Sequence, residues 1–141
     1  MIEAKARMVR AYRADRPLVL LFDYDGTLVP IVDHPSRAAL APRTRDLLER
    51  LARRPRVFLG ILSGRKLSDL EQLVGLAHVY YAGAAGLELN LRGARTIHPR
   101  AESGRGLIEE LCARLQEALT AYPRAWVENK QFGLTVHYRA A

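Results

Sequence analysis

The sequence lacks the features that mark several large classes of protein. Its single cysteine, Cys112, excludes an internal disulfide framework and predicts a reducing compartment, the cytoplasm. No apolar run approaches the roughly 20 residues that a membrane-spanning helix needs, so we expect no membrane partner. The N-terminus is basic but carries Glu3 and Asp15 and has no apolar stretch, so it predicts neither a secretory signal nor a transit peptide.

The sequence has fewer acidic than basic residues. The 141 residues include 22 Lys and Arg against 15 Asp and Glu, for a net charge of +7. Such an excess can indicate a nucleic-acid partner, which would bind with steeply salt-dependent affinity. Here the arginines are spread along the whole chain, and aromatic residues, 7% of the total, do not interleave with them. We therefore expect no nucleic-acid partner, although a positive field would attract phosphorylated small molecules.

In the first part of the chain, apolar runs alternate with amphipathic segments. Continuous apolar runs at 18–22 and 57–62, and the later stretch "HVYYAG", predict three strands, of which the first two are buried on both faces. Leucine periodicity predicts helices over 44–53 and 66–74. A strand–helix alternation of this kind predicts a Rossmann-like α/β core with a parallel sheet and right-handed crossovers.

After Gly86 the pattern changes. "LELNL" and "ARTIH" flank Arg92-Gly93 and predict a hairpin. A stripe of leucines predicts a long helix over 107–122, with Ser103 as its cap. "AWVENK" and "FGLTVHYR" then predict two strands joined by a tight turn near Gln131.

This change of pattern divides the chain into two parts. We expect the N-terminal part of an α/β core over 1–90 and an incomplete α/β cap over 91–141, with the boundary at roughly 86–100. The core sheet then has only three strands and leaves a hydrophobic edge unpaired. We therefore expect the isolated chain to be poorly stable, oligomeric or inactive. The sequence does not give its oligomeric state.

The residues at two strand ends are typical of a catalytic site. Asp23 and Asp25 end the first strand, and Ser63 and Gly64 follow the second. The carboxyl ends of parallel strands share one edge of a sheet, so these residues should meet there. Two carboxylates so close repel unless a cation is present, and Mg²⁺ prefers such oxygen ligands. A hydroxyl and exposed N–H groups hold an anion, which together suits phosphoryl transfer to an aspartate.

Each of these residues also has a structural interpretation. The aspartate pair can close a strand in an Asx turn, and Ser63 can cap the helix that follows it. Arg65 reads as a structural or surface arginine. Glu88 can be either a solvated strand residue or a functional one. Glu128 and Lys130 can be a cross-strand surface pair worth a few tenths of a kcal/mol.

One motif decides between these interpretations. "DYDGTL" matches the D-x-D-G-T-[LV] signature of the haloacid dehalogenase-like phosphatases. Within that superfamily the chain resembles the trehalose-6-phosphate phosphatases over residues 17–139. The resemblance rests on "FDYDGTLVPI", "LSGR", "YAGAAGLEL" and above all "VENKQFGLTVHYR", which is similar to a hairpin in the family's cap.

The resemblance implies roles for the strand-end residues. Asp23 is expected to be the nucleophile that accepts the phosphoryl group, and Asp25 the general acid and base. The Asp23 side chain and the Asp25 backbone carbonyl are expected to hold Mg²⁺. Ser63, with the N–H of Gly64, is expected to bind the phosphoryl group.

The resemblance also implies a small-molecule substrate, trehalose 6-phosphate. Glu128 and Lys130 lie on alternate residues of one strand and face the same way, so both are expected to bind sugar hydroxyls. Two alternatives stay open. One is another capped sugar phosphatase, and the other is a truncated, catalytically inactive fragment that binds phosphosugars.

The chain departs from the family pattern in two ways. The family usually has Asn-His-Gly where this chain has Ala84-Ala85-Gly86, so two polar side chains are replaced by methyl groups. The family also needs a lysine that bridges nucleophile and phosphate, and a G-D-D-x-x-D-E segment that supplies further Mg²⁺ ligands. No "GDD" occurs in this sequence.

Overall fold

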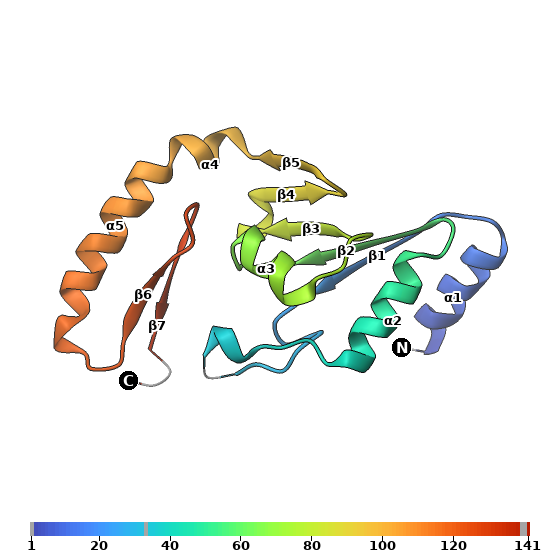
Figure 1. Cartoon of the computed structure of the whole chain (residues 1–141), viewed down its shortest axis with the longest axis horizontal. Helices are drawn as coiled ribbons and strands as arrows, with labels where there is room; N and C mark the ends of the chain where they lie inside the picture. Colours follow the sequence, from blue (N-terminus) through green and yellow to red (C-terminus); the bar gives the residue numbers. More distant parts are fainter. Residues whose placement is uncertain (1, 33, 139–140) are drawn as a thin grey trace.

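The computed structural model describes residues 2–32, 34–138 and 141. Figure 1 shows a five-stranded sheet with its helices, and beside it a two-stranded hairpin that runs along a long helix. Within the described residues, no helix is both long and apolar enough to cross a membrane.

The first three strands run parallel and are connected by helices, as the alternating pattern predicts. The strands are β1 (Leu18–Asp23), β2 (Val57–Leu62) and β3 (Tyr80–Gly83). The helices are α1 (Ile2–Arg13), α2 (Pro42–Ala52) and α3 (Leu67–Val74), and a short 3₁₀ turn, η1 (Pro35–Arg37), lies before α2. Helix α2 begins two residues before the predicted start because Pro42, whose fixed φ suits a helix start, occupies its first turn.

The core sheet has five strands, so the prediction of three was wrong. A 3₁₀ turn, η2 (Ala84–Gly86), reverses the chain after β3, and β4 (Glu88–Leu91) pairs antiparallel with β3. Strand β5 (Ala94–Ile97) completes the predicted hairpin and the order β1-β2-β3-β4-β5. A division at residue 90/91 would split this hairpin. We propose that the core extends to Ile97, which lies within the predicted boundary range.

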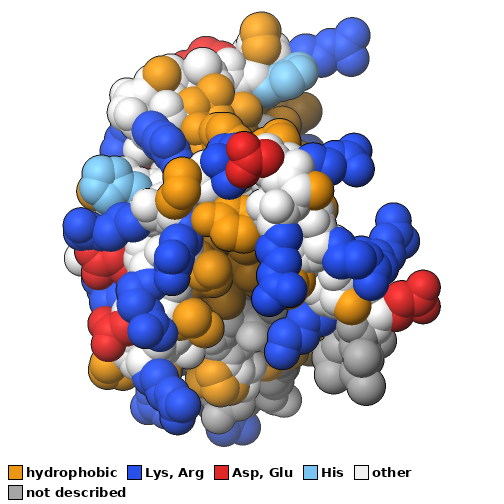
Figure 2. All heavy atoms as spheres, turned by 90° about the vertical axis from the view of Figure 1, so that its right-hand side faces the viewer, with side chains coloured by type: hydrophobic (Ala, Val, Ile, Leu, Met, Phe, Trp, Pro, Cys, Tyr) orange, Lys and Arg blue, Asp and Glu red, His pale blue; other side chains and the backbone are white. Residues whose placement is uncertain are grey.

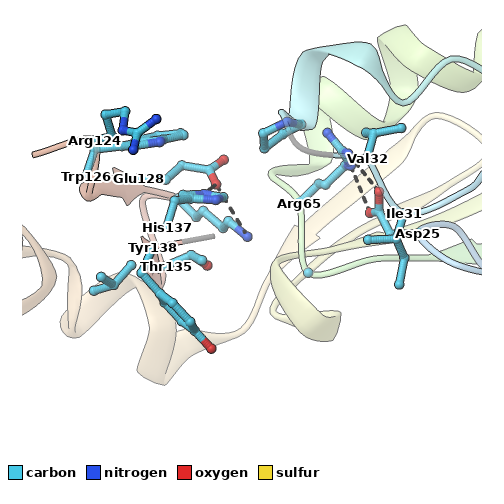
Figure 3. Close-up of a pocket in the computed structure, with 14 residues that line it drawn as sticks. Asp25, Ile31, Val32, Arg65, Arg124, Trp126, Glu128, Thr135, His137 and Tyr138 are labelled. Carbon is cyan, nitrogen blue, oxygen red and sulfur yellow. Dashed lines mark hydrogen bonds and ion pairs between the residues drawn. The ribbon is translucent and has the colours of Figure 1, made fainter. Parts of the chain in front are cut away.

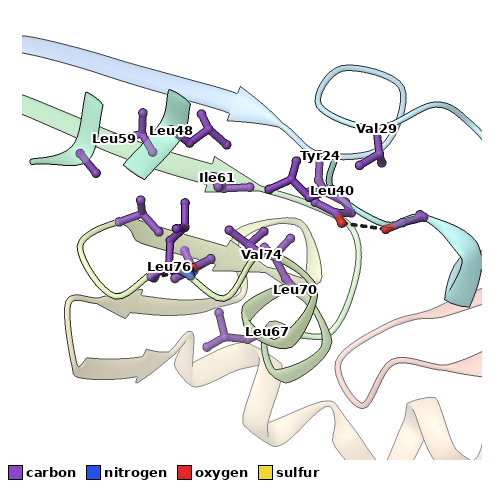
Figure 4. Close-up of a cluster of buried hydrophobic side chains, with 14 residues drawn as sticks. Tyr24, Val29, Leu40, Leu48, Leu59, Ile61, Leu67, Leu70, Val74 and Leu76 are labelled. Carbon is purple, nitrogen blue, oxygen red and sulfur yellow. Dashed lines mark hydrogen bonds between the residues drawn. The ribbon is translucent and has the colours of Figure 1, made fainter. Parts of the chain in front are cut away.

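The hydrophobic core lies between the sheet and helices α2 and α3. Alternate residues of β2, Leu59 and Ile61, point into it and are fully buried. Leu70 and Val74 of α3 meet them, and Figure 4 shows this cluster continuing to Tyr24 beyond the end of β1. The hydroxyl of Tyr24 donates to the carbonyl of Ala38 at 2.7 Å, which fixes the loop after β1 to the core.

The opposite face of the sheet is not covered by the described residues. Val19 and Leu21 of β1 are 61% and 64% exposed, and Phe58 and Leu62 of β2 are also exposed. The prediction that these strands are buried on both faces was therefore wrong for this chain. Their continuous apolar sequence suits burial on both faces, but among the described residues α2 and α3 cover one face and leave the other exposed.

Positive charge is spread over the face of the molecule on which α1 lies (Figure 2). Figure 2 views the molecule from the side of α1, and Lys and Arg side chains stand over this whole face with hydrophobic side chains between them. Helix α1 carries basic residues in its last turn, as does α2.

The second part of the chain packs a hairpin against a helix. It comprises α4 (Pro99–Ser103), α5 (Arg105–Ala118), a 3₁₀ turn η3 (Leu119–Ala121), β6 (Trp126–Asn129) and β7 (Leu134–His137). The two strands join through a turn in which Gln131 has a positive φ of 72°, where the tight turn was predicted. Ser103 does not cap the long helix: it ends α4, and its hydroxyl donates to the carbonyl of Arg100.

The uncovered face of β1 predicts self-association, because β1 is also an edge strand of the sheet. We expect Leu21→Gln to weaken self-association of this chain in sedimentation velocity, and to change the free energy of unfolding by less than about 0.5 kcal/mol. Leu107→Gln is the matched control, since Leu107 is 60% exposed on α5. Equal weakening by both substitutions would contradict the assignment to the β1 face.

Candidate active site

The parallel pairing of β1 with β2 brings the two strand ends together. Asp23 lies opposite Leu62 in the register, so the residues that follow each strand emerge side by side. The Ser63 hydroxyl donates to Oδ2 of Asp25 at 3.2 Å, although 37 residues separate them in the sequence. Ser63 is 6% exposed and is the buried polar residue of this region. The predicted meeting of the aspartate motif with Ser63 is what the structure shows.

Arg65 holds the Asp25 carboxylate. Its Nε donates to Oδ2 at 2.9 Å and its Nη2 to Oδ1 at 2.7 Å, a two-point ion pair. The Arg65 side chain is only 12% exposed and lies over the ring of Tyr24. The hydrogen bond to Asp25 raises the pKa of Arg65, so the guanidinium stays charged. Of the two interpretations that the sequence allowed for Arg65, the structure supports the structural one, because its guanidinium holds Asp25 and is largely buried.

The Asp23 carboxylate is less engaged in hydrogen bonds than that of Asp25. It lies on the exposed side of β1, and its Oδ2 accepts a hydrogen bond from the Thr27 hydroxyl at 3.2 Å. Its carboxylate is a hard oxygen ligand free to meet a cation, whereas the carboxylate of Asp25 is occupied by Arg65 and Ser63. No group of three or more His, Cys, Asp or Glu gathers as a metal cluster among the described residues. The Asp23 side chain and the Asp25 backbone carbonyl remain a proposal as Mg²⁺ ligands.

The turn after β3 braces the loop that carries Ser63 and Arg65. The N–H of Ala84 donates to the carbonyl of Arg65 at 2.6 Å, and that of Ala85 to the carbonyl of Ser63 at 3.0 Å. Both alanines have positive φ, 48° and 56°, a conformation that costs alanine roughly 1 kcal/mol. The bracing comes from the backbone, so it does not require the polar side chains that the family usually has here.

The start of α3 is fixed by two other features. An added Cβ on Gly83 would lie 2.5 Å from the backbone of Leu67, so only glycine allows β3 to approach α3 this closely. The N–H of Leu67 donates to the Glu88 carboxylate at 2.9 Å, which gives Glu88 a structural role at this helix. Lys66 occupies the N-cap position, so Ser63 is not the cap of α3.

The hairpin β6–β7 presents polar side chains on one face. Trp126 and Glu128 alternate with Val127 along β6, and Lys130 follows on the same side. Lys130 Nζ lies 3.7 Å from Oε2 of Glu128. Nε2 of His137, on β7, lies 2.8 Å from the same oxygen. The side chains on this face, those of Trp126, Glu128, Lys130 and His137, are partly buried.

A cleft of about 360 Å³ separates this face from the strand ends. Asp25, Gly64 and Arg65 line it from the core, and Trp126, Glu128, Lys130 and His137 line it from the hairpin. Figure 3 shows the two groups facing one another across the gap, with the Arg65–Asp25 pair on one side and the Glu128–His137 pair on the other. This volume suits a small molecule. Asp23 and Ser63 do not line the cleft but lie directly beside Asp25.

The tip of the hairpin packs against the core. Phe132 is 6% exposed and forms a small apolar cluster with Ala84 and Ala101, under the guanidinium of Arg105. Ala84 is one of the residues that departs from the family pattern, and it belongs to this apolar cluster instead of offering a polar group. The cluster holds the two walls of the cleft in place at one end.

The cleft residues to which sequence reasoning gave no role include Arg65, Trp126 and His137. Arg65 follows the serine by two residues, a position that turns back toward the strand ends. Trp126 lies two residues before Glu128 on the same strand, and His137 lies opposite Trp126. Strand alternation therefore places the three side chains on one face, and this was the signal in the sequence that could have identified them.

Comparison with known proteins decides the family. The sequence model of the family described as "Trehalose-phosphatase" matches residues 21–141. The chain belongs to the trehalose-phosphatase family. The predicted resemblance to this family and the predicted α/β fold with a parallel core are therefore confirmed.

Individual relatives support the assignment to the trehalose-phosphatase family. The trehalose-phosphate phosphatase of Mycobacterium tuberculosis is 39% identical over 127 residues, 89% of this chain and 32% of that protein. The protein of the same name from Mycobacterium marinum is 40% identical over 127 residues, with the same coverage. The chain thus spans about a third of the length of these curated relatives.

Solved structures show the same fold. The C-terminal domain of Candida albicans trehalose-6-phosphate phosphatase superposes with a TM-score of 0.82 at 28% identity, over 95% of this chain and 47% of that one. Aspergillus fumigatus trehalose-6-phosphate phosphatase gives 0.63 at 29% identity, over 96% of this chain and 51% of that one.

The Arg65–Asp25 pair predicts that replacing Arg65 destabilises the protein more than replacing the exposed Arg53. Arg65→Met removes both hydrogen bonds from the Asp25 carboxylate, whose partner guanidinium is only 12% exposed, and is expected to lower the free energy of unfolding by about 1.5 kcal/mol. Arg53→Met is the matched control, because Arg53 is 63% exposed and pairs with Glu49 one helical turn away. Arg53→Met should lower the free energy of unfolding, measured by urea denaturation, by less than about 0.5 kcal/mol. Equal losses would show that Asp25 does not depend on Arg65.

Proposed function

We propose that this chain is the part of a Mg²⁺-dependent phosphatase that hydrolyses trehalose 6-phosphate to trehalose and phosphate. One observation supports this most strongly: a single cleft is lined by Asp25, Gly64 and Arg65 on the core side and by Glu128 and Lys130 on the hairpin side. The core side is proposed to meet the phosphoryl group, and the hairpin side the sugar hydroxyls. A sugar phosphate has a phosphoryl group that suits the core side of the cleft and hydroxyl groups that suit the hairpin side. Relatives with 39% and 40% identity carry the name trehalose-phosphate phosphatase.

In the proposed reaction an Asp23 carboxylate oxygen attacks phosphorus, and the bond from phosphorus to the sugar oxygen breaks. Asp25 gives its proton to that leaving oxygen. Asp25 then takes a proton from water, and the resulting hydroxide attacks the aspartyl phosphate, which releases phosphate and restores Asp23. Asp25 is held by Arg65 and Ser63 before substrate enters, so proton transfer requires it to loosen from Arg65.

The phosphoryl group would lie beside Ser63 and Gly64. The Ser63 hydroxyl and the N–H of Gly64 are the donors proposed to hold it. Mg²⁺, when bound to the Asp23 carboxylate and the Asp25 carbonyl, screens the charge of the phosphate from the attacking carboxylate. The positive charge of Arg65 in the cleft lining adds attraction for the same anion.

Glu128 and Lys130 are proposed to bind the sugar. A carboxylate accepts hydrogen bonds from hydroxyl groups and an ammonium donates to them. The pair can therefore bind one sugar hydroxyl as a donor and another as an acceptor. Fixed partners of this kind reject ligands that lack the hydroxyls. Phosphate release from a panel of disaccharide and monosaccharide phosphates would separate trehalose 6-phosphate from the substrate of another capped sugar phosphatase.

A second candidate function is binding of phosphosugars without turnover. The observation that favours it is the engagement of both Asp25 oxygens by Arg65 and Ser63, so the residue proposed as the acid is already hydrogen-bonded. Binding of trehalose 6-phosphate with no release of phosphate, by the complete gene product with Mg²⁺, would establish it.

We expect Asp23→Asn to lower the rate of phosphate release from trehalose 6-phosphate by at least about 10³-fold, because the amide cannot attack phosphorus. Removal of Mg²⁺ with a chelator should abolish release, and added Mg²⁺ should restore it. The assay uses the complete gene product that contains this chain. Asp46→Asn, at an exposed position of α2, is the control and should retain full activity. An Asp23→Asn protein with undiminished turnover would end the proposal.

A further inference from the structure

We propose that His137 is a positioning residue that orients the Glu128 carboxylate toward the sugar, an inference that rests on the proposed function and deepens it. His137 is opposite Trp126 in the hairpin register, and Glu128 is opposite Thr135. His137 therefore reaches Glu128 diagonally across the two strands. Its Nε2 lies 2.8 Å from Oε2 of Glu128 and donates to that oxygen.

The imidazole ring is itself held in one orientation. It stacks on the indole of Trp126 with ring centroids 4.0 Å apart and planes 12° from parallel. The ring of His34, from the loop after β1, stacks on the same indole at 5.9 Å and 21°. An aromatic stack fixed from both the hairpin and the core therefore sets the direction of the Nε2–H bond.

This arrangement uses one Glu128 oxygen and leaves the other for a ligand. Oε2 accepts from His137 and lies near the ammonium of Lys130. Among the described residues, Oε1 has no hydrogen-bond partner, and Glu128 lines the cleft. The Glu128 side chain is 21% exposed, so few solvent contacts compete for its orientation. Oε1 is thereby presented as a fixed acceptor for a hydroxyl.

The same geometry explains why this position carries histidine. Phenylalanine could stack on Trp126 but could not donate to Glu128, and glutamine could donate but would stack poorly. Neutral histidine with its proton on Nε2 does both, and the imidazolium form does so as well. The proposal therefore predicts that the hydrogen bond to Glu128 contributes more to substrate recognition at position 137 than ring packing does.

The test compares His137→Phe with His137→Gln in the complete gene product. For His137→Phe we expect KM and the calorimetric Kd for trehalose 6-phosphate to rise about tenfold, the effect of one lost charge-assisted hydrogen bond. Its kcat should stay within about twofold of the wild type, since no transition-state contact is removed. His137→Gln should keep both constants within about threefold of the wild type, because its amide still donates.

Two controls separate positioning from packing. The kcat/KM for para-nitrophenyl phosphate, which has no sugar hydroxyls, should be unchanged in His137→Phe. His78→Phe, at an exposed position before β3, should leave every constant unchanged. An unchanged Kd for trehalose 6-phosphate in His137→Phe overturns the proposal, as does an equal loss with para-nitrophenyl phosphate.

The outcome also distinguishes this inference from the proposed function. If the wild type binds trehalose 6-phosphate but releases no phosphate, the proposed reaction fails, and the Kd ratio of the two variants alone decides on His137. If the wild type binds no trehalose 6-phosphate, both are overturned.

Discussion

The parallel pairing of β1 with β2 is the constraint on which the site depends. Its register places Asp23 opposite Leu62, and from that alignment Asp25 meets Ser63 and Arg65 just beyond the strands. The core under α2 and α3 fixes this register, because a slip of one residue would turn Leu59 and Ile61 away from the helices. Packing on one face of the sheet therefore determines the chemistry at its end.

The hairpin wall has a different origin. Glu128, Lys130 and His137 gather because strand alternation puts them on the face of the hairpin that turns away from α5. Phe132 on the core and Trp126 under His34 connect this wall to the strand ends. The cleft thus has a polar face on each side, positioned by apolar and aromatic contacts outside the site.

Sequence patterns predict the elements well and their neighbours less well. The buried apolar runs identified β1 and β2, and the aspartate motif with Ser63 located the strand-end site. The extension of the sheet by β4 could not be predicted, because a hairpin pattern does not say which strand it joins. The Arg65–Asp25 pair was missed for a similar reason. A charge in a loop gains its role only from a partner that the fold supplies, here 40 residues away.

The most direct test of the central claim is whether one ligand contacts both walls at once. Trehalose 6-phosphate titrated into the ¹⁵N-labelled protein with Mg²⁺ should shift the amide resonances of Gly64 and Arg65 on the core. It should shift those of Glu128 and Lys130 on the hairpin with the same Kd. Shifts confined to one wall, or different Kd values for the two, would contradict the account.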